Sequence, residues 1–89
     1  MTIVIFRRDT DGGEIVAFFP DIPANSGYAT CYTPVGQHSS YSRSYFLDNT
    51  QPATPIEYAG LEAELRSIGY DDLKICKRHP PLIYGQPLR

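Results

Sequence analysis

The sequence predicts a two-layer α+β domain with the order β-β-β-α-β, in which one helix, over about residues 55–68, packs on a mostly antiparallel sheet. Two observations favour this class. The segment 54–69 carries a complete set of helix signals. The segments 2–8, 14–19, 28–33 and 73–78 are short runs rich in β-forming residues. The chain of 89 residues fits a single domain, which we place at residues 1–79, followed by a proline-rich tail at 80–89.

The helix is predicted from its first residue to its last. Thr54 is expected to be the N-cap, Pro55 suits the first helical position, and Glu57 stands where a capping box needs it. Gly69 is expected to end the helix in a left-handed conformation. Between them, an apolar stripe at helical spacing is formed by Tyr58, Leu61, Leu65 and Ile68. A helix with one apolar stripe requires one flat partner surface, which a sheet provides.

The first two strands are expected to form a hairpin. In the run 2–8, Val4 and Phe6 alternate with Ile3 and Ile5, and the residues 9–13 supply the Asp and Gly of a tight turn. The run 14–19 is apolar on both faces, which is typical of a central strand. We expect Pro20 to end it and the residues 20–27 to form a connector.

The third strand, at 28–33, places small residues such as Ala29 and Cys31 on one face, where the helix is expected to approach. The polar segment 37–51 shows no sustained periodicity and is predicted to be mainly a long surface loop. Within it, residues 45–47 are expected to form a short added strand or an anchor. In the last strand, at 73–78, Leu73 and Ile75 are expected to face inward.

Composition restricts the class of protein. The chain is 42% hydrophobic, and eight basic against ten acidic residues give a formal charge of −2, which does not favour binding to phosphate backbones or anionic lipid. The run of apolar residues at 3–6 is too short for a signal peptide, and no stretch is long enough to span a membrane, so we expect a cytoplasmic protein without a membrane partner. The two cysteines, Cys31 and Cys76, suit a reducing compartment, although a disulfide between them stays open.

The residues that carry catalytic or metal chemistry elsewhere form no convincing motif. Cys31, His38, Cys76 and His79 lack the spacing of a structural zinc site. The run His38-Ser39-Ser40 lacks a nucleophile elbow, and the acidic residues near the first turn suit its local hydrogen bonding. Lys74, Lys77 and Arg78 indicate a protected sheet edge. We therefore predict no catalytic residue, no metal and no cofactor, and a protein that is not an enzyme.

The most suggestive group is a cluster of tyrosines in the middle of the chain. We predict a binding face made of Tyr28, Tyr32, His38, Tyr41, Arg43 and Tyr45. Tyrosine and arginine are enriched at protein interfaces, and tyrosines on an open sheet also stack on bases. The sequence predicts a protein-interaction or regulatory module. The same face would also suit the formation of a homodimer. Two alternatives remain: a single-stranded RNA or DNA binder, and a loop that packs these tyrosines beneath it.

The segment 11–23, Asp-Gly-Gly-Glu-Ile-Val-Ala-Phe-Phe-Pro-Asp-Ile-Pro, resembles the second-strand region of HicB-like antitoxins. In that family an Asp-Gly turn leads through an apolar strand to Phe-Pro-Asp-Leu-Pro, and the order β-β-β-α-β is the same. The resemblance implies a small antitoxin-type domain whose partner is an RNA-cleaving toxin. The segment 37–51 and the helix start at Thr54 depart from the family pattern.

Overall fold

The alternating apolar strands form the centre of a mixed sheet. We describe residues 2–24, 28–34 and 37–78 of a computed structural model. Its elements, in chain order, are β1 (Thr2–Asp9), β2 (Ile15–Pro23), β3 (Ala29–Thr33), β4 (Gln37–Tyr41), α1 (Arg43–Asn49), β5 (Thr50–Pro52), α2 (Pro55–Ser67) and β6 (Leu73–Ile75). The sheet has the order β4-β3-β2-β1-β5, and β6 adds to the β5 side of β1 in parallel while all the other pairs are antiparallel.

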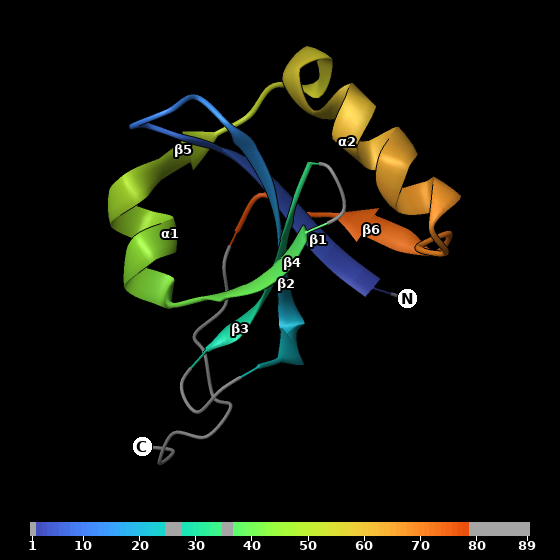
Figure 1. The fold of residues 1–89 in the computed structure, drawn as a ribbon, viewed down its shortest axis with the longest axis horizontal. Helices are drawn as coiled ribbons and strands as arrows, with labels where there is room; N and C mark the ends of the chain where they lie inside the picture. The colour runs from blue at the N-terminus through green and yellow to red at the C-terminus, as the bar shows by residue number, and fades with distance from the viewer. Residues whose placement is uncertain (1, 25–27, 35–36, 79–89) are drawn as a thin grey trace.

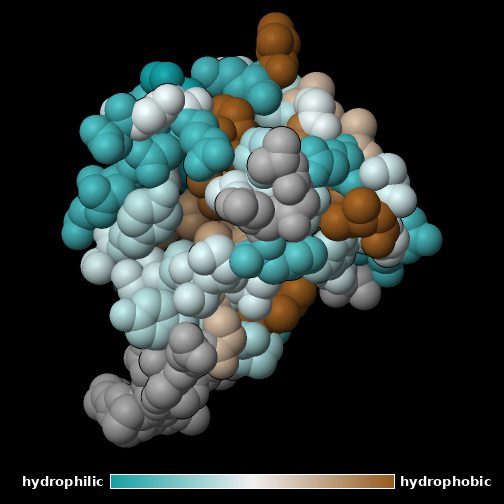
Figure 2. Space-filling view, viewed as in Figure 1, coloured by the Kyte–Doolittle hydropathy of each residue, from teal (hydrophilic) through white to brown (hydrophobic). Residues whose placement is uncertain are grey.

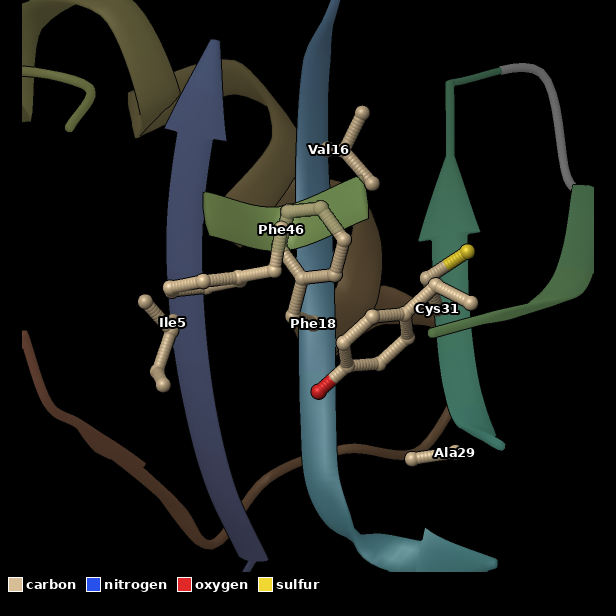
Figure 3. Close-up of a cluster of buried hydrophobic side chains, with 7 residues drawn as sticks. Ile5, Val16, Phe18, Ala29, Cys31 and Phe46 are labelled. Carbon is tan, nitrogen blue, oxygen red and sulfur yellow. The ribbon is translucent and has the colours of Figure 1, made fainter. Parts of the chain in front are cut away.

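The central strands β1 and β2 bury side chains on both faces, as their sequence predicts. One cluster of buried side chains consists of Val4, Phe6, Ala17, Phe19, Tyr32, Leu61 and Leu65. The other consists of Ile5, Val16, Phe18, Ala29, Cys31, Tyr41 and Phe46. Figure 3 shows the labelled strand side chains of the second cluster on the same side of the sheet, with Phe46 of α1 beside Phe18. Because neighbouring residues of a strand point to opposite faces, each face needs its own cover.

Two helices provide this cover, one on each face of the sheet (Figure 1). The α+β class and the mostly antiparallel sheet are therefore confirmed, but the expected order with a single helix on one face is not what the chain forms. The helix α2 lies on the Tyr32 face, not on the Ala29 and Cys31 face where we expected it. The small residues of that second face make room for α1 instead.

The segment 37–51 was predicted as mainly a loop, and this prediction is wrong. It forms the edge strand β4, the short helix α1 and the start of β5. The Ser42 hydroxyl accepts the Tyr45 N–H and so caps α1. Phe46 is the one side chain of α1 that is buried, which makes it the anchor of the segment. The cap is local, but Phe46 packs against Phe18 and accepts from Arg7, far away in the sequence, so local periodicity does not report this anchoring.

The helix α2 forms as the sequence predicts. Thr54 is its N-cap, and the reciprocal capping box with Glu57 is present. Leu61 and Leu65 are buried, and Gly69 has a φ of +118° just beyond the helix. Ile68 is an exception to the predicted stripe, because it is 51% exposed at the C-cap.

Two further expectations about strands need correction. The strand β2 continues past the buried Pro20 to Pro23, with an irregular register between Phe19 and Pro23. A proline is tolerated at such an irregularity because its position needs no ladder donor. In β6, Leu73 packs against the core, whereas Ile75 is 38% exposed. The tail at 80–89 lies outside the described residues.

Candidate functional site

The six residues predicted to form one binding face lie on both faces of the sheet. Tyr32 and Tyr41 are 1% and 3% exposed and belong to the two different core clusters. The sheet register explains the separation. Tyr32 pairs with His38, and Tyr41 pairs with Ala29. Because His38 and Tyr41 are an odd number of residues apart on β4, their side chains point to opposite faces. Their rings are core side chains, so the predicted single tyrosine-lined face does not exist.

On the α2 side, the polar ends of the aromatic side chains are joined by hydrogen bonds. The Tyr32 hydroxyl donates to the Glu64 carboxylate. The His38 Nε2 lies 3.0 Å from the Tyr70 hydroxyl, and the His38 ring packs edge-on against Tyr32 with centroids 4.7 Å apart. Tyr70 in turn stacks on Phe19. These contacts fix the exposed His38 side chain against the sheet.

On the α1 side, the other tyrosines border a shallow hollow of about 310 Å³. Its lining includes Tyr28, Cys31, Ser39, Tyr41, Ser42 and Tyr45. Tyr28 is 43% exposed, while Arg43 is exposed on α1 outside the lining. The hollow is therefore the place where three of the six predicted residues meet.

Tyr45 is held at the rim of this hollow by Asp9. The Tyr45 hydroxyl donates to the Asp9 carboxylate, which also accepts the N–H groups of Asp11 and Gly12 in the β1–β2 turn. Burial and this carboxylate raise the pKa of Tyr45 above its ordinary value. The Tyr45 hydroxyl, followed by the turn N–H groups, lowers the pKa of Asp9. The pair connects α1 to the first turn of the chain.

The strand β4 forms one end of the sheet, so one of its sides has no neighbouring strand in the sheet order. Which backbone groups face that side follows from the hydrogen bonds of β1. The carbonyls of Val4 and Phe6 accept from the N–H groups of Cys76 and Ala53, on the far edge of β1. The backbone N–H and C=O groups of the even-numbered residues of β1 therefore face away from β2. Those of the odd-numbered residues form the hydrogen bonds to β2.

The register carries this alternation across the sheet to β4. Cys31 lies opposite Ser39, and this pair exchanges the backbone hydrogen bonds between β3 and β4. The backbone N–H and C=O groups of His38 and Ser40 then point outward from the sheet. No residue of β4 is charged or a proline. Two devices by which natural sheets protect an edge, charged side chains and proline, are thus missing from this strand.

The opposite edge of the sheet is protected. The strands β5 and β6 have three residues each, and β5 ends at Pro52. Lys74, Lys77 and Arg78 are exposed along and beyond β6. Short strands, proline and lysine all disfavour the addition of a further strand. Within the part of the chain that the structure describes, the sheet therefore has one protected edge and one open edge.

The cysteines and histidines do not assemble a reactive centre within the described ranges. Both cysteines are free. The strands β2 and β1 lie between β3, which contains Cys31, and Cys76 just after β6, a separation of about 14 Å at the usual strand spacing. A disulfide needs less than about 7 Å between Cα atoms. Burial raises the pKa of the Cys31 thiol to about 11. Ser39 lies on the opposite face from His38, and no three metal-binding side chains gather among residues 2–24, 28–34 and 37–78.

The exposed hydrophobic side chains are scattered. Among the described residues the large ones are Tyr28, Leu47, Ile56, Ile68 and Ile75, which come from five different parts of the chain. In the view of Figure 2 the hydrophobic side chains form separate groups among hydrophilic ones. Scattered exposure of this kind does not by itself mark an interface. The open backbone of β4 is thus a more specific feature than any apolar patch.

The comparisons with known proteins assign no family. No protein-family model, curated protein or solved structure matches the chain. Among the helices of the described residues, none is long and apolar enough to cross a membrane.

Proposed function

We propose that this protein is a small interaction module that binds a partner protein by accepting one of its strands at the open edge of β4. The observation that carries this proposal is the unprotected edge itself, where His38 and Ser40 present outward backbone groups on an uncharged strand. An added strand gains affinity from main-chain hydrogen bonds, and specificity from the pockets that receive its alternate side chains.

The two sides of β4 offer different pockets to such a strand. On the α2 side, the His38 imidazole is held beside Tyr70. On the α1 side, Ser39 and Tyr41 lead into the hollow bordered by Tyr45. An incoming strand alternates its side chains between these two surroundings. A small or polar side chain suits the hydroxyl-lined hollow, and an aromatic or acidic one suits the exposed imidazole.

The resemblance to HicB-like antitoxins is consistent with this proposal and suggests an RNA-cleaving toxin as the partner. The residues that carry the resemblance form the β1–β2 turn and the strand β2, and Val16, Phe18 and Phe19 among them are buried. The resemblance thus concerns the core of the sheet, while the proposed contact lies at its edge.

Binding of single-stranded RNA or DNA is not supported by the geometry. A stacking platform needs exposed rings on one face, whereas Tyr32 and Tyr41 are buried on opposite faces. The formal charge of −2 also disfavours contact with phosphates.

The proposal is tested with the pair Ser40→Pro and Ser40→Thr. Proline removes the outward N–H without touching the bonds to β3, and threonine keeps that N–H and the β-forming character. Each purified variant is used to capture proteins from a lysate of the source cells, with and without nuclease, and retained proteins are identified by mass spectrometry. We expect one protein to be retained by the wild type and Ser40→Thr but not by Ser40→Pro, regardless of nuclease.

Two outcomes would contradict this proposal. In the first, the same protein is retained by Ser40→Pro with unchanged yield, which places the contact elsewhere. In the second, all retention disappears with nuclease, which transfers the function to nucleic acid. Sedimentation equilibrium of the same variants asks whether the partner strand is the β4 of a second copy. Because the other edge is protected, such self-association would close as a dimer rather than extend as a fibre.

A further inference from the structure

The outer edge of β1 is covered by two short strands that leave a gap between them. The strand β6 pairs with residues 2–4 of β1, and β5 pairs with residues 7–9. The last hydrogen bonds on either side run from the Cys76 N–H to the Val4 carbonyl and from the Ala53 N–H to the Phe6 carbonyl. Because the Phe6 N–H faces the same edge as its carbonyl, it lies at the gap.

This gap opens into a cavity of about 430 Å³, a volume within the ordinary range of small-molecule sites. Most of its lining is apolar and includes Ile5, Phe6, Pro52, Ala53, Tyr58 and Ile75. Phe6 and Tyr58 stack on each other with ring centroids 4.3 Å apart, so the two rings form one continuous wall. Two cations, Arg7 and Lys77, also line the cavity, and none of the described residues that line it is acidic.

Arg7 is a partly buried cation whose hydrogen bonds all go to neutral acceptors. Its Nε donates to the Thr50 hydroxyl, and its Nη2 donates to the carbonyls of Thr50 and Phe46. Its guanidinium also lies 4.3 Å from the centre of the Phe46 ring. Burial lowers the pKa of Arg7 below its ordinary value. Among the described residues, no carboxylate pairs with Arg7, and its Nη1 has no hydrogen-bond partner.

We propose that this cavity is a binding site for a small amphiphilic carboxylate. The apolar part of the ligand lies in the gap, between Ile5 on one face of the sheet and Phe6 and Tyr58 on the other. Its carboxylate binds the free side of the Arg7 guanidinium, with Lys77 at the rim. An anion at this point compensates a partly buried cation, and an arginine–carboxylate contact is charge-assisted. The site lies on β1 and is separate from the β4 edge, so it goes beyond the proposed interaction function.

The probe is octanoate, and 1-octanol is the uncharged control with the same chain length. Both are titrated into the full-length protein, and amide chemical shifts are followed by NMR. We expect octanoate to shift the amides of Ile5, Phe6 and Cys76 with saturation, and octanol to bind about tenfold more weakly or worse. Equal affinity of the two probes, or no saturable shifts at these amides, would overturn the proposal.

The cations are tested by matched variants. Lys77 lines the cavity, whereas Lys74 is an exposed lysine of β6 outside the lining. We expect Lys77→Met to weaken octanoate binding several-fold and Lys74→Met to leave it unchanged. Arg7→Met removes the main carboxylate contact and is expected to lower the affinity about tenfold or more. If it does not fold, the lysine pair and the octanol control still decide the result.

Another occupant is the chain's own segment beyond Arg78, which contains Leu82 and Ile83. The variant Ile83→Asp in the full-length chain tests it. If the apolar residues of that segment filled the cavity, this change would release them, and octanoate would bind the variant markedly more tightly than the wild type. That result would assign the cavity to the tail and overturn the proposal. We expect equal affinity for the variant and the wild type.

Discussion

The two faces of the sheet are covered in different ways. On one face, α2 is a helix of 13 residues with a capping box, and it buries Leu61 and Leu65 against the sheet. On the other face, α1 has seven residues and buries Phe46 alone. The first face is held by a helix that local sequence specifies. The second is held by one aromatic anchor and by contacts with residues far away in the sequence.

The contacts that hold α1 come from β1 and the first turn. Arg7 donates to the carbonyls of Phe46 and Thr50 near the C-terminal end of α1, and Tyr45 donates to Asp9. Cations near the end of a helix also complement its dipole. The thinner cover leaves the hollow beside β4 open. The difference between the faces therefore explains why the candidate interaction site lies on the β4 side and borders α1.

The largest effect is expected from removing the anchor of each helix. Phe46→Ala should destabilise the protein by about 3–5 kcal/mol and Leu65→Ala by about 2–5 kcal/mol, because both residues are fully packed. Leu47→Ala, a neighbour of the first that is 51% exposed, should cost less than about 0.5 kcal/mol. Urea unfolding of the three variants measures this. If Phe46→Ala matched Leu47→Ala, α1 would not be anchored as described.

A smaller loss is expected at Thr50, the buried polar residue that joins α1 to Arg7. Its hydroxyl donates to the Phe46 carbonyl and accepts from the Arg7 Nε at 2.9 Å. Thr50→Val should cost roughly 1–3 kcal/mol, because it leaves a partly buried donor without its acceptor. Thr10→Val is the control, since the Thr10 hydroxyl makes an exposed bond to the Asn49 carbonyl. If Thr50→Val and Thr10→Val lost the same stability in thermal denaturation, the role of the Arg7 contact would be contradicted.

The two N-caps allow a direct comparison of the helices. Thr54→Ala should cost about 1 kcal/mol through loss of the bond to the Glu57 N–H. Ser42→Ala removes the equivalent bond to the Tyr45 N–H, and we expect a loss of about 0.5–1 kcal/mol. The two variants separate further by amide exchange. Loss of the Ser42 cap should speed exchange in α1 alone, and loss of the Thr54 cap should speed it in α2 alone.

The smallest effect is a dependence of stability on pH that comes from Tyr45 and Asp9. The raised pKa of Tyr45 stabilises the fold at pH values below its unfolded pKa of about 10. This contribution is lost as the pH rises above that value. The lowered pKa of Asp9 stabilises the fold at pH values above about 4 and is lost as the pH falls.

The variant Tyr45→Phe isolates this contribution. Its unfolding midpoint should fall less steeply between pH 10 and 11 than that of the wild type, while the acid limb keeps the part due to the turn N–H groups. Unfolding midpoints of both proteins are measured across the pH range. Identical alkaline limbs would show that the Tyr45 hydroxyl does not bond Asp9 in solution.

The comparison of the two helices also shows what the sequence can predict. The start of α2 can be predicted from the local sequence, because the contacts of Thr54, Pro55 and Glu57 are with neighbours within four residues. The α+β class and the two-faced strands β1 and β2 follow from alternation in the same way. The helix α1 depends on Arg7 and Thr50, which bond to each other across 43 positions of sequence, and no local pattern contains that contact.

The candidate site was predicted only in part for the same reason. Sequence drew attention to the segment of Tyr41 and Tyr45, which does border the hollow. The sequence did not reveal that Tyr32 and Tyr41 are buried on opposite faces of the sheet, because the pairing of their strands was not known. It also missed the proposed role of Ser40, which depends on the backbone of that residue. The absence of charge and proline over residues 37–41 was the available signal for an open edge.

The most direct measurement is amide hydrogen exchange across β4, made with the isolated protein and with the partner that Ser40→Pro fails to capture. In the isolated protein we expect fast exchange at His38 and Ser40 and slow exchange at Ser39 and Tyr41, whose N–H groups bond to β3. With the partner bound, His38 and Ser40 should become protected. A bound partner that leaves these two amides exchanging as fast as before would contradict strand addition at the β4 edge.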